Sequence, residues 1–89
     1  MDLNDALTSK IHRKIIIFFN ENQASIDTPR GIATWIREER SLVKKALEDL
    51  VALGILEAYR TSSTTGYGYT TDKKTTSKIG KLLKNAPTS

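Results

Sequence analysis

The chain has 89 residues, a length that favours one domain near the lower limit for folding around its own core. The absence of cysteine excludes a disulfide framework and a thiolate metal site, and no segment approaches the roughly 20 apolar residues of a membrane span. The formal net charge is +4, and the stretch 61–89, with five basic residues and one acidic residue, carries nearly all of the excess, a balance that favours polyanion partners.

The first predicted helix runs from about Ser9 to Asn22, with Thr8 as its N-cap. The preceding segment, MDLNDAL, is acidic rather than basic and is not typical of a signal peptide, so we expect a cytoplasmic protein. The residues expected to face the core follow helical spacing: Leu7, Ile11, Ile15, Phe18 and Phe19. The run 15–19 is apolar throughout and covers more than one helical face. Either this helix is central and contacted on several sides, or it contributes to a dimer interface.

A second, shorter helix is predicted over residues 29–37. Thr28 followed by Pro29 is a strong start signal, because the threonine can cap the helix and proline suits its first position. The segment 25–27 before it is expected to form a very short strand. We expect Trp35 to fill the edge of the core rather than to stack on a base.

The third predicted helix spans residues 40–53 and follows a turn at Glu38 and Glu39. Its buried face recurs at steps of three and four: Val43, Ala46, Leu47, Leu50 and Leu53. Gly54 follows, at the place where a helix needs a residue that tolerates positive φ in order to stop. Two helices joined by a turn and followed by a hairpin form a helix-turn-helix with a wing.

The rest of the chain predicts that hairpin and a final helix. Residues 56–71 form the predicted wing, in which alternating residues supply one strand and Gly66 to Thr70 supply the return strand. The predicted tip, residues 61–65, is polar and uncharged. Residues 72–85 predict a short helix weakened by Gly80, and residues 86–89 a frayed end.

This pattern resembles the winged helix-turn-helix core of small bacterial and archaeal transcriptional regulators, including the MarR-like group. The residues that carry the resemblance are Ile32, Ala33, Ile36, Val43, Ala46, Leu47, Leu50, Gly54, Ile55 and Leu56. The resemblance implies one α+β winged-helix domain, with a three-helix helix-turn-helix core and a two- or three-stranded antiparallel wing over residues 8–71 and a short C-terminal helix over 72–85. It also implies a homodimer formed through helix one and the C-terminal helix. One departure is Glu39, a carboxylate near the expected phosphate approach, where the family usually places a Ser or Thr N-cap.

The sequence offers little for catalysis or for a metal. His12 is the only histidine and is predicted to be a surface residue on the polar side of the first helix, without the companions that a zinc site needs. Glu38 and Glu39 point to different sides of a turn and make a poor acid–base pair. The GYG sequence at 66–68 lacks the lysine and the helix of a phosphate-binding loop. We therefore predict no enzyme, no cofactor and no metal.

Nucleic-acid binding has a physical route, because an α-helix fits the major groove of DNA with its N-terminal turns at the base edges. We expect Arg40 to read guanine. The other predicted contacts come from the same helix, the start of the second helix, the wing and the segment after it: Ser41, Lys44 and Lys45; Thr28 and Arg30; Arg60, Thr61, Ser62, Ser63 and Tyr67; and Lys73, with Lys74 and Lys78 extending the positive track. The alternative is that these charges only solvate exposed faces.

The sequence thus predicts sequence-specific binding of double-stranded DNA by a dimeric transcriptional regulator, with recognition helix 40–53 in the major groove and wing 56–71 on the backbone or in the minor groove. Two alternatives stay open. One is a winged-helix protein–protein interaction module without DNA binding, which Leu42 and the acidic pairs at 38–39 and 48–49 favour. The other is binding of structured RNA.

Overall fold

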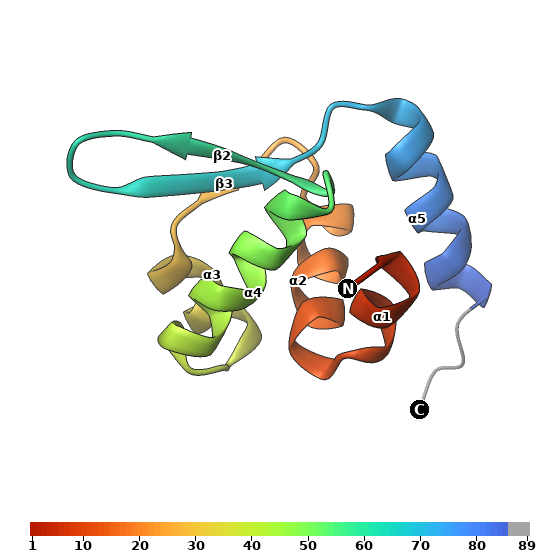
Figure 1. Cartoon of the computed structure of the whole chain (residues 1–89), viewed down its shortest axis with the longest axis horizontal. Helices are drawn as coiled ribbons and strands as arrows, with labels where there is room; N and C mark the ends of the chain where they lie inside the picture. The colour runs from red at the N-terminus through yellow and green to blue at the C-terminus, as the bar shows by residue number, and fades with distance from the viewer. Residues whose placement is uncertain (86–89) are drawn as a thin grey trace.

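The structure, a computed structural model, describes residues 1–85, which form five helices and a three-stranded sheet (Figure 1). In chain order the elements are α1 (Leu3–Thr8), α2 (Lys10–Glu21), β1 (Ile26–Asp27), α3 (Pro29–Ile36), α4 (Arg40–Ala52), β2 (Leu56–Arg60), β3 (Thr65–Tyr69) and α5 (Lys73–Asn85). The predicted α+β fold class is confirmed. The predicted frayed end at 86–89 lies outside the described residues. No helix within residues 1–85 is both long and apolar enough to cross a membrane.

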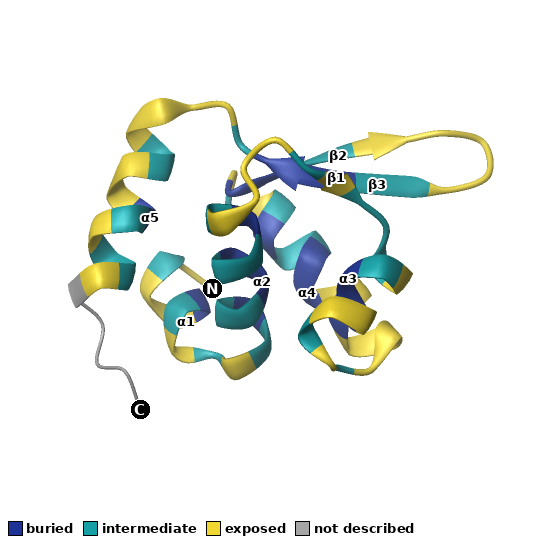
Figure 2. Ribbon diagram, turned by 180° about the vertical axis from the view of Figure 1, so that it is seen from behind, coloured by how far each residue is buried: buried dark blue, intermediate teal, exposed yellow. Residues whose placement is uncertain are grey.

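Helix α2 occupies the centre of the molecule (Figure 2). The side chains of Ile15, Ile16 and Phe19 are fully buried, and those of Ile17 and Phe18 are half-buried. Helices α1, α3, α4 and α5 all pack against α2. One interpretation of the apolar run 15–19, a central helix contacted on several sides, is therefore confirmed. A contribution of this helix to a dimer stays a prediction.

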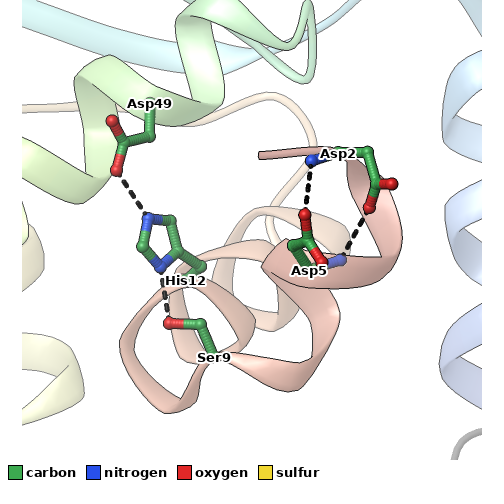
Figure 3. Close-up of polar contacts among 5 residues, drawn as sticks. All are labelled: Asp2, Asp5, Ser9, His12 and Asp49. Atoms are coloured by element: carbon green, nitrogen blue, oxygen red, sulfur yellow. Dashed lines mark hydrogen bonds and ion pairs between the residues drawn. The ribbon is translucent and has the colours of Figure 1, made fainter.

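The first correction concerns the N-terminal segment, which forms a helix of its own. A reciprocal capping box starts α1: the Asp5 N–H donates to the Asp2 carboxylate at 2.9 Å, and the Asp2 N–H donates to the Asp5 carboxylate at 3.1 Å (Figure 3). Thr8, predicted as the N-cap of the next helix, is instead the last residue of α1, and Ser9 holds the N-cap position of α2.

Local signals set the ends of α3 and α4 where the sequence predicted them. The Thr28 hydroxyl accepts from the Gly31 N–H at 3.2 Å and so caps α3. Gly54 has φ of +76° and ends α4 in a Schellman arrangement, in which the Ile55 N–H donates to the Leu50 carbonyl at 3.0 Å. The apolar face of α4 is buried in the core: Val43, Ala46, Leu47 and Leu50.

The sheet has the strand order β1-β3-β2 with both pairs antiparallel. Strands β2 and β3 pair from Leu56 opposite Tyr69 to Arg60 opposite Thr65, and β1 adds only two residues to the other edge of β3. The wing is therefore a hairpin with a short third strand. The loop between β2 and β3, residues 61–64, is closed by Thr61, whose N–H donates to the Thr64 carbonyl at 2.8 Å.

Helix α5 confirms the predicted C-terminal helix and continues through Gly80. Ile79 is fully buried and Leu83 packs against the core, which fixes this face of α5 on the molecule. The lysines of α5 are exposed on its other faces: Lys73, Lys74, Lys78, Lys81 and Lys84. Helix α5 lies at the end of the molecule opposite the loop of the wing (Figure 1).

Candidate nucleic-acid interface

Three segments that are distant in the sequence border one surface groove of about 660 Å³. They are the start of α3, the first turns of α4 and the loop of the wing. The lining residues are Thr28, Pro29, Arg30, Arg40, Lys44, Thr61, Ser62, Ser63, Thr64, Thr65 and Tyr67. The structure thus brings eight of the twelve residues predicted for DNA binding to one place. Ser41, Lys45, Arg60 and Lys73 are not among the residues that line this groove.

The first turn of α3 forms one wall of the groove. Arg30 is exposed there, beside the helix end at which backbone N–H groups concentrate partial positive charge. Thr28 accepts only one of these N–H groups with its hydroxyl, that of Gly31. The Asp27 carboxylate accepts from the Thr28 N–H at 2.8 Å and lies against Gly31, so it already occupies part of this helix start. The exposed Arg30 therefore supplies the charge that favours an anion such as a phosphate here.

Helix α4 presents Arg40 and Lys44 to the groove, one turn apart on the same side of the helix. Both are exposed, and neither forms an ion pair with another residue in the described part of the chain. Glu39 holds the N-cap position of α4, but its carboxylate accepts from the Ser41 hydroxyl at 2.6 Å instead of capping the helix. The Ser41 hydroxyl is therefore engaged locally, while the two cations remain available to a ligand.

Lys45 and Lys73 lie away from the groove. Lys45 is exposed on another side of α4, where it borders a hollow with His12, Leu42 and Asp49. Lys73 borders a separate hollow with other lysines of α5, at the end of the molecule opposite the wing loop (Figure 1). The predicted positive track from the wing into α5 is therefore not continuous with the groove.

The root of the wing contains the main correction to the predicted site. Tyr67 is one of the wing residues predicted to contact DNA, but its residue exposure is 0% and its hydroxyl donates to the Glu48 carboxylate on α4. The Arg60 guanidinium donates to the same carboxylate at 2.8 Å. Tyr67 therefore reaches the groove only as part of its floor and is not placed to stack on a base.

The hydrogen bonds from Arg60 and Tyr67 favour the ionised form of the Glu48 carboxylate. The hydrogen bond from Arg60, followed by that from Tyr67, lowers the pKa of Glu48 below its ordinary value of 4.5. Burial, followed by the hydrogen bond to Glu48, raises the pKa of Tyr67 above 10.0. In the sequence Glu48 stands out only as part of the acidic pair at 48–49. Its two partners lie 12 and 19 residues further along the chain, in β2 and β3, and no local pattern indicates them.

His12 is buried, with 8% exposure, and so the prediction of a surface histidine is wrong. The Ser9 hydroxyl lies 2.6 Å from Nδ1, and Nε2 lies 2.9 Å from the Asp49 carboxylate (Figure 3). The tautomer that satisfies both contacts carries its proton on Nε2. Since Asp49 lies on α4, this contact joins the central helix to the helix that carries Arg40 and Lys44.

Trp35 is also placed differently from the prediction. Its exposure is 72%, whereas Ile32 and Ala33 fill the buried face of α3. The ring lies beside that of Phe18, with centroids 6.3 Å apart, in a surface hollow that also includes Ile17 and the exposed Ile26. This hollow is separate from the groove lined by Arg40 and Lys44.

Comparison with known proteins finds similar structures but no related sequence. No protein-family model matches the chain, and no curated protein matches it significantly in sequence. Among solved structures, it resembles the homodimeric winged helix-turn-helix DNA-binding domain of Mb0332 from Mycobacterium bovis, a possible ArsR-family transcriptional regulator, with a TM-score of 0.72 and 16% identity over 90% of this chain and 70% of that one. It also resembles HlyU from Vibrio cholerae, with a TM-score of 0.71 and 13% identity over 92% and 85% of the two chains.

The cadmium sensor CMTR from Mycobacterium tuberculosis is a further neighbour, with a TM-score of 0.64 and 19% identity over 98% of this chain and 94% of that one. Identities this low show a shared fold. The chain therefore has the winged-helix fold of these transcriptional regulators. The neighbours do not single out the MarR-like group.

Proposed function

We propose that this protein binds double-stranded DNA through the groove between α3, α4 and the wing loop, and that it acts as a transcriptional regulator. One observation carries the proposal: Arg40 and Lys44, both without an ion-pair partner in residues 1–85, meet the start of α3 and the hydroxyl-rich loop around one hollow. The cations at the start of α4 can contact base edges in the major groove, while the neighbouring start of α3 can contact a phosphate of the same duplex.

In this arrangement the first turns of α4 enter the major groove. Arg40 would read guanine, and Lys44 would share base edges with it. The start of α3, with Arg30, would hold a phosphate at the groove rim. Ser62 and Ser63, exposed at the tip of the wing, would follow the backbone or the adjacent minor groove. Sequence specificity would come from α4, because only base-edge contacts distinguish sequences.

We further propose that the regulator is a homodimer formed through the N-terminal helices and α5. Helix α2 is largely covered within one chain, so α1, α5 and the half-buried residues of α2 would supply the contact. This end of the molecule lies away from the wing loop (Figure 1), and the Mb0332 domain is described as homodimeric. A two-fold axis there would place the two α4 helices about one helical turn apart on the duplex. Membership of the MarR-like group and a cytoplasmic location belong to the same proposal.

The test is a titration of duplex DNA at several salt concentrations with two double variants of equal charge. Arg40→Ala/Lys44→Ala removes two cations from the groove, and Lys78→Ala/Lys81→Ala removes two from α5. We expect the groove variant to lose about 2–4 kcal/mol of binding. The slope of log affinity against log salt should fall by at most about 1.8, the value for two cations that neutralise phosphates, because Arg40 and Lys44 are assigned mainly to base edges. The α5 variant should bind at least as tightly as the parent, because it keeps both groove cations and less charge repulsion opposes the proposed dimer. Equal losses in both variants would refute the assignment of the groove.

A protein–protein interaction module is the second candidate, because one observation favours it. Trp35 and Ile26 line one surface hollow, and their exposures are 72% and 60%. Binding of DNA through cations does not need this exposed apolar surface, which is typical of a protein-interaction site. Duplex affinity of the parent that neither responds to salt nor exceeds background would favour this candidate. Hairpin RNA titrated at matched salt distinguishes the RNA alternative.

A further inference from the structure

Glu48 is the residue through which α4 holds both strands of the wing. One carboxylate oxygen, Oε1, accepts from the Arg60 guanidinium of β2 at 2.8 Å, and the other, Oε2, accepts from the Tyr67 hydroxyl of β3. Glu48 lies one helical turn after Lys44, which places it on the side of α4 that faces the wing. A single carboxylate thus joins α4 to both strands of the wing.

This placement is unfavourable if charge alone matters. A carboxylate on a surface that binds a polyanion repels phosphates, and it also pairs with Arg60, a cation that could otherwise contact DNA. Electrostatics alone therefore predict tighter duplex binding once Glu48 is neutralised. The geometry gives the opposite expectation, because both hydrogen bonds fix the angle between the wing and α4.

We propose that Glu48 is a positioning residue for DNA binding, which holds the wing so that its loop and the start of α4 reach the same duplex. The inference rests on the proposed function. Tyr67 contributes through its buried ring and its hydroxyl, and Arg60 contributes through its contact with Glu48 rather than with phosphate. The serines of the loop then depend on Glu48 for their place over the backbone.

Two substitutions with the same change of charge separate these expectations. Glu48→Gln keeps the size of the side chain but has one carbonyl oxygen where two carboxylate oxygens accepted separately. Glu39→Gln is the matched control: Glu39 is exposed at the start of α4, and among the described residues its carboxylate accepts only from the nearby Ser41. We expect the Glu39 variant to bind duplex about 2- to 5-fold more tightly. The Glu48 variant should bind roughly tenfold more weakly, equivalent to about 1.4 kcal/mol.

Tyr67→Phe provides a variant without any change of charge. It keeps the buried ring, removes the donor to Glu48 and should also weaken binding by several-fold at a temperature where the protein remains folded. Loss of wing position has a further signature. Ser62→Ala/Ser63→Ala should weaken binding by the parent but have little further effect in the Tyr67→Phe background, because that wing no longer reaches the backbone. Additive losses would instead indicate a general effect of Tyr67 on folding.

Failure of the positioning role and failure of the proposed function give different results. If the parent binds duplex with the expected salt dependence and Glu48→Gln binds more tightly, as Glu39→Gln does, Glu48 only masks Arg60 and the positioning role is wrong. If the parent itself shows no salt-dependent duplex binding, the proposed function fails and the role of Glu48 fails with it. Weaker binding by both Glu48→Gln and Tyr67→Phe, with non-additive loss at the loop serines, supports the inference.

Discussion

Tyr67 and Tyr69 are two residues apart on β3 and are both buried, yet their hydroxyl groups differ in environment. The Tyr67 hydroxyl donates to Glu48, whereas the Tyr69 hydroxyl is buried without a hydrogen-bond partner in the described structure. A buried polar group without a partner destabilises a protein by about 1–3 kcal/mol. The Tyr69 ring stacks near Phe19 with centroids 6.4 Å apart, and phenylalanine keeps that contact. Tyr69→Phe should therefore raise the free energy of unfolding by about 1–2 kcal/mol.

Thermal and urea unfolding measure this change directly. For a domain of this size, each kcal/mol corresponds to about 4–8 °C in Tm. Tyr67→Phe makes the same chemical change on the same strand and should lower stability by about 1–2 kcal/mol, since it removes a donor from a charged acceptor. The two variants should thus shift Tm in opposite directions. A Tyr69→Phe protein that is destabilised as much as Tyr67→Phe would refute the reasoning, because its hydroxyl must then have a partner in solution.

Alkaline pH gives a second measurement of the same group. Burial raises the pKa of Tyr69 from 10.0 to about 12. Between these values the unfolded chain releases the phenol proton while the folded chain retains it, so stability is complete below pH 10.0 and falls as pH rises toward the folded pKa. In Tyr69→Phe this loss should be absent, and its stability should decline less between neutral and alkaline pH than that of the parent.

Three further predictions concern other parts of the fold. Gly54→Ala should destabilise the protein by about 1–2 kcal/mol, because φ at this position is +76°. No atom lies within 4 Å of an added Cβ, so the effect comes from the backbone conformation alone. An unchanged midpoint in urea unfolding would contradict this prediction. His12→Ala should lower Tm, because it removes the contact between α2 and Asp49 on α4. Lys45→Ala, at an exposed position on α4, is the control and should lower Tm less. The pKa of Glu48 is lowered in the folded protein, so the stabilisation from its carboxylate is present above pH 4.5 and is lost as pH falls through the pKa of the folded state. The stability of Glu48→Gln should therefore decline less in acid than that of the parent. Urea unfolding across this pH range measures the difference.

Features set by neighbouring residues could be predicted from the sequence. Thr28 and Pro29 fix the start of α3, and Gly54 fixes the end of α4, because each acts within a few residues through a cap or a backbone angle. Helix α1 carries a local signal of the same kind at its start. Asp2 and Asp5 have the spacing of a capping box, with aspartate in place of the more usual glutamate.

Features set by distant partners could not be predicted in this way. His12 is buried because Asp49, 37 residues further along the chain, accepts from its ring, and no local pattern indicates that pairing. Tyr67 is an intermediate case. Strand periodicity places it on the same face of β3 as Tyr69, so burial of one implies burial of the other, but the partner on α4 depends on how the wing packs. The same packing decides that Glu48 faces the wing.

Cationic side chains are concentrated at two ends of the molecule, and salt should affect these ends in opposite ways. Arg40 and Lys44 face the groove, whereas α5 carries five lysines and no acidic residue over Lys73–Asn85. Duplex binding at the groove releases counterions, so it weakens as salt rises. A homodimer through α5 would bring lysines of two copies toward each other, and salt screens this repulsion. Sedimentation of the free protein should therefore show more dimer at the salt concentrations that release DNA. If the dimer instead dissociates as salt rises, its interface does not include the lysines of α5.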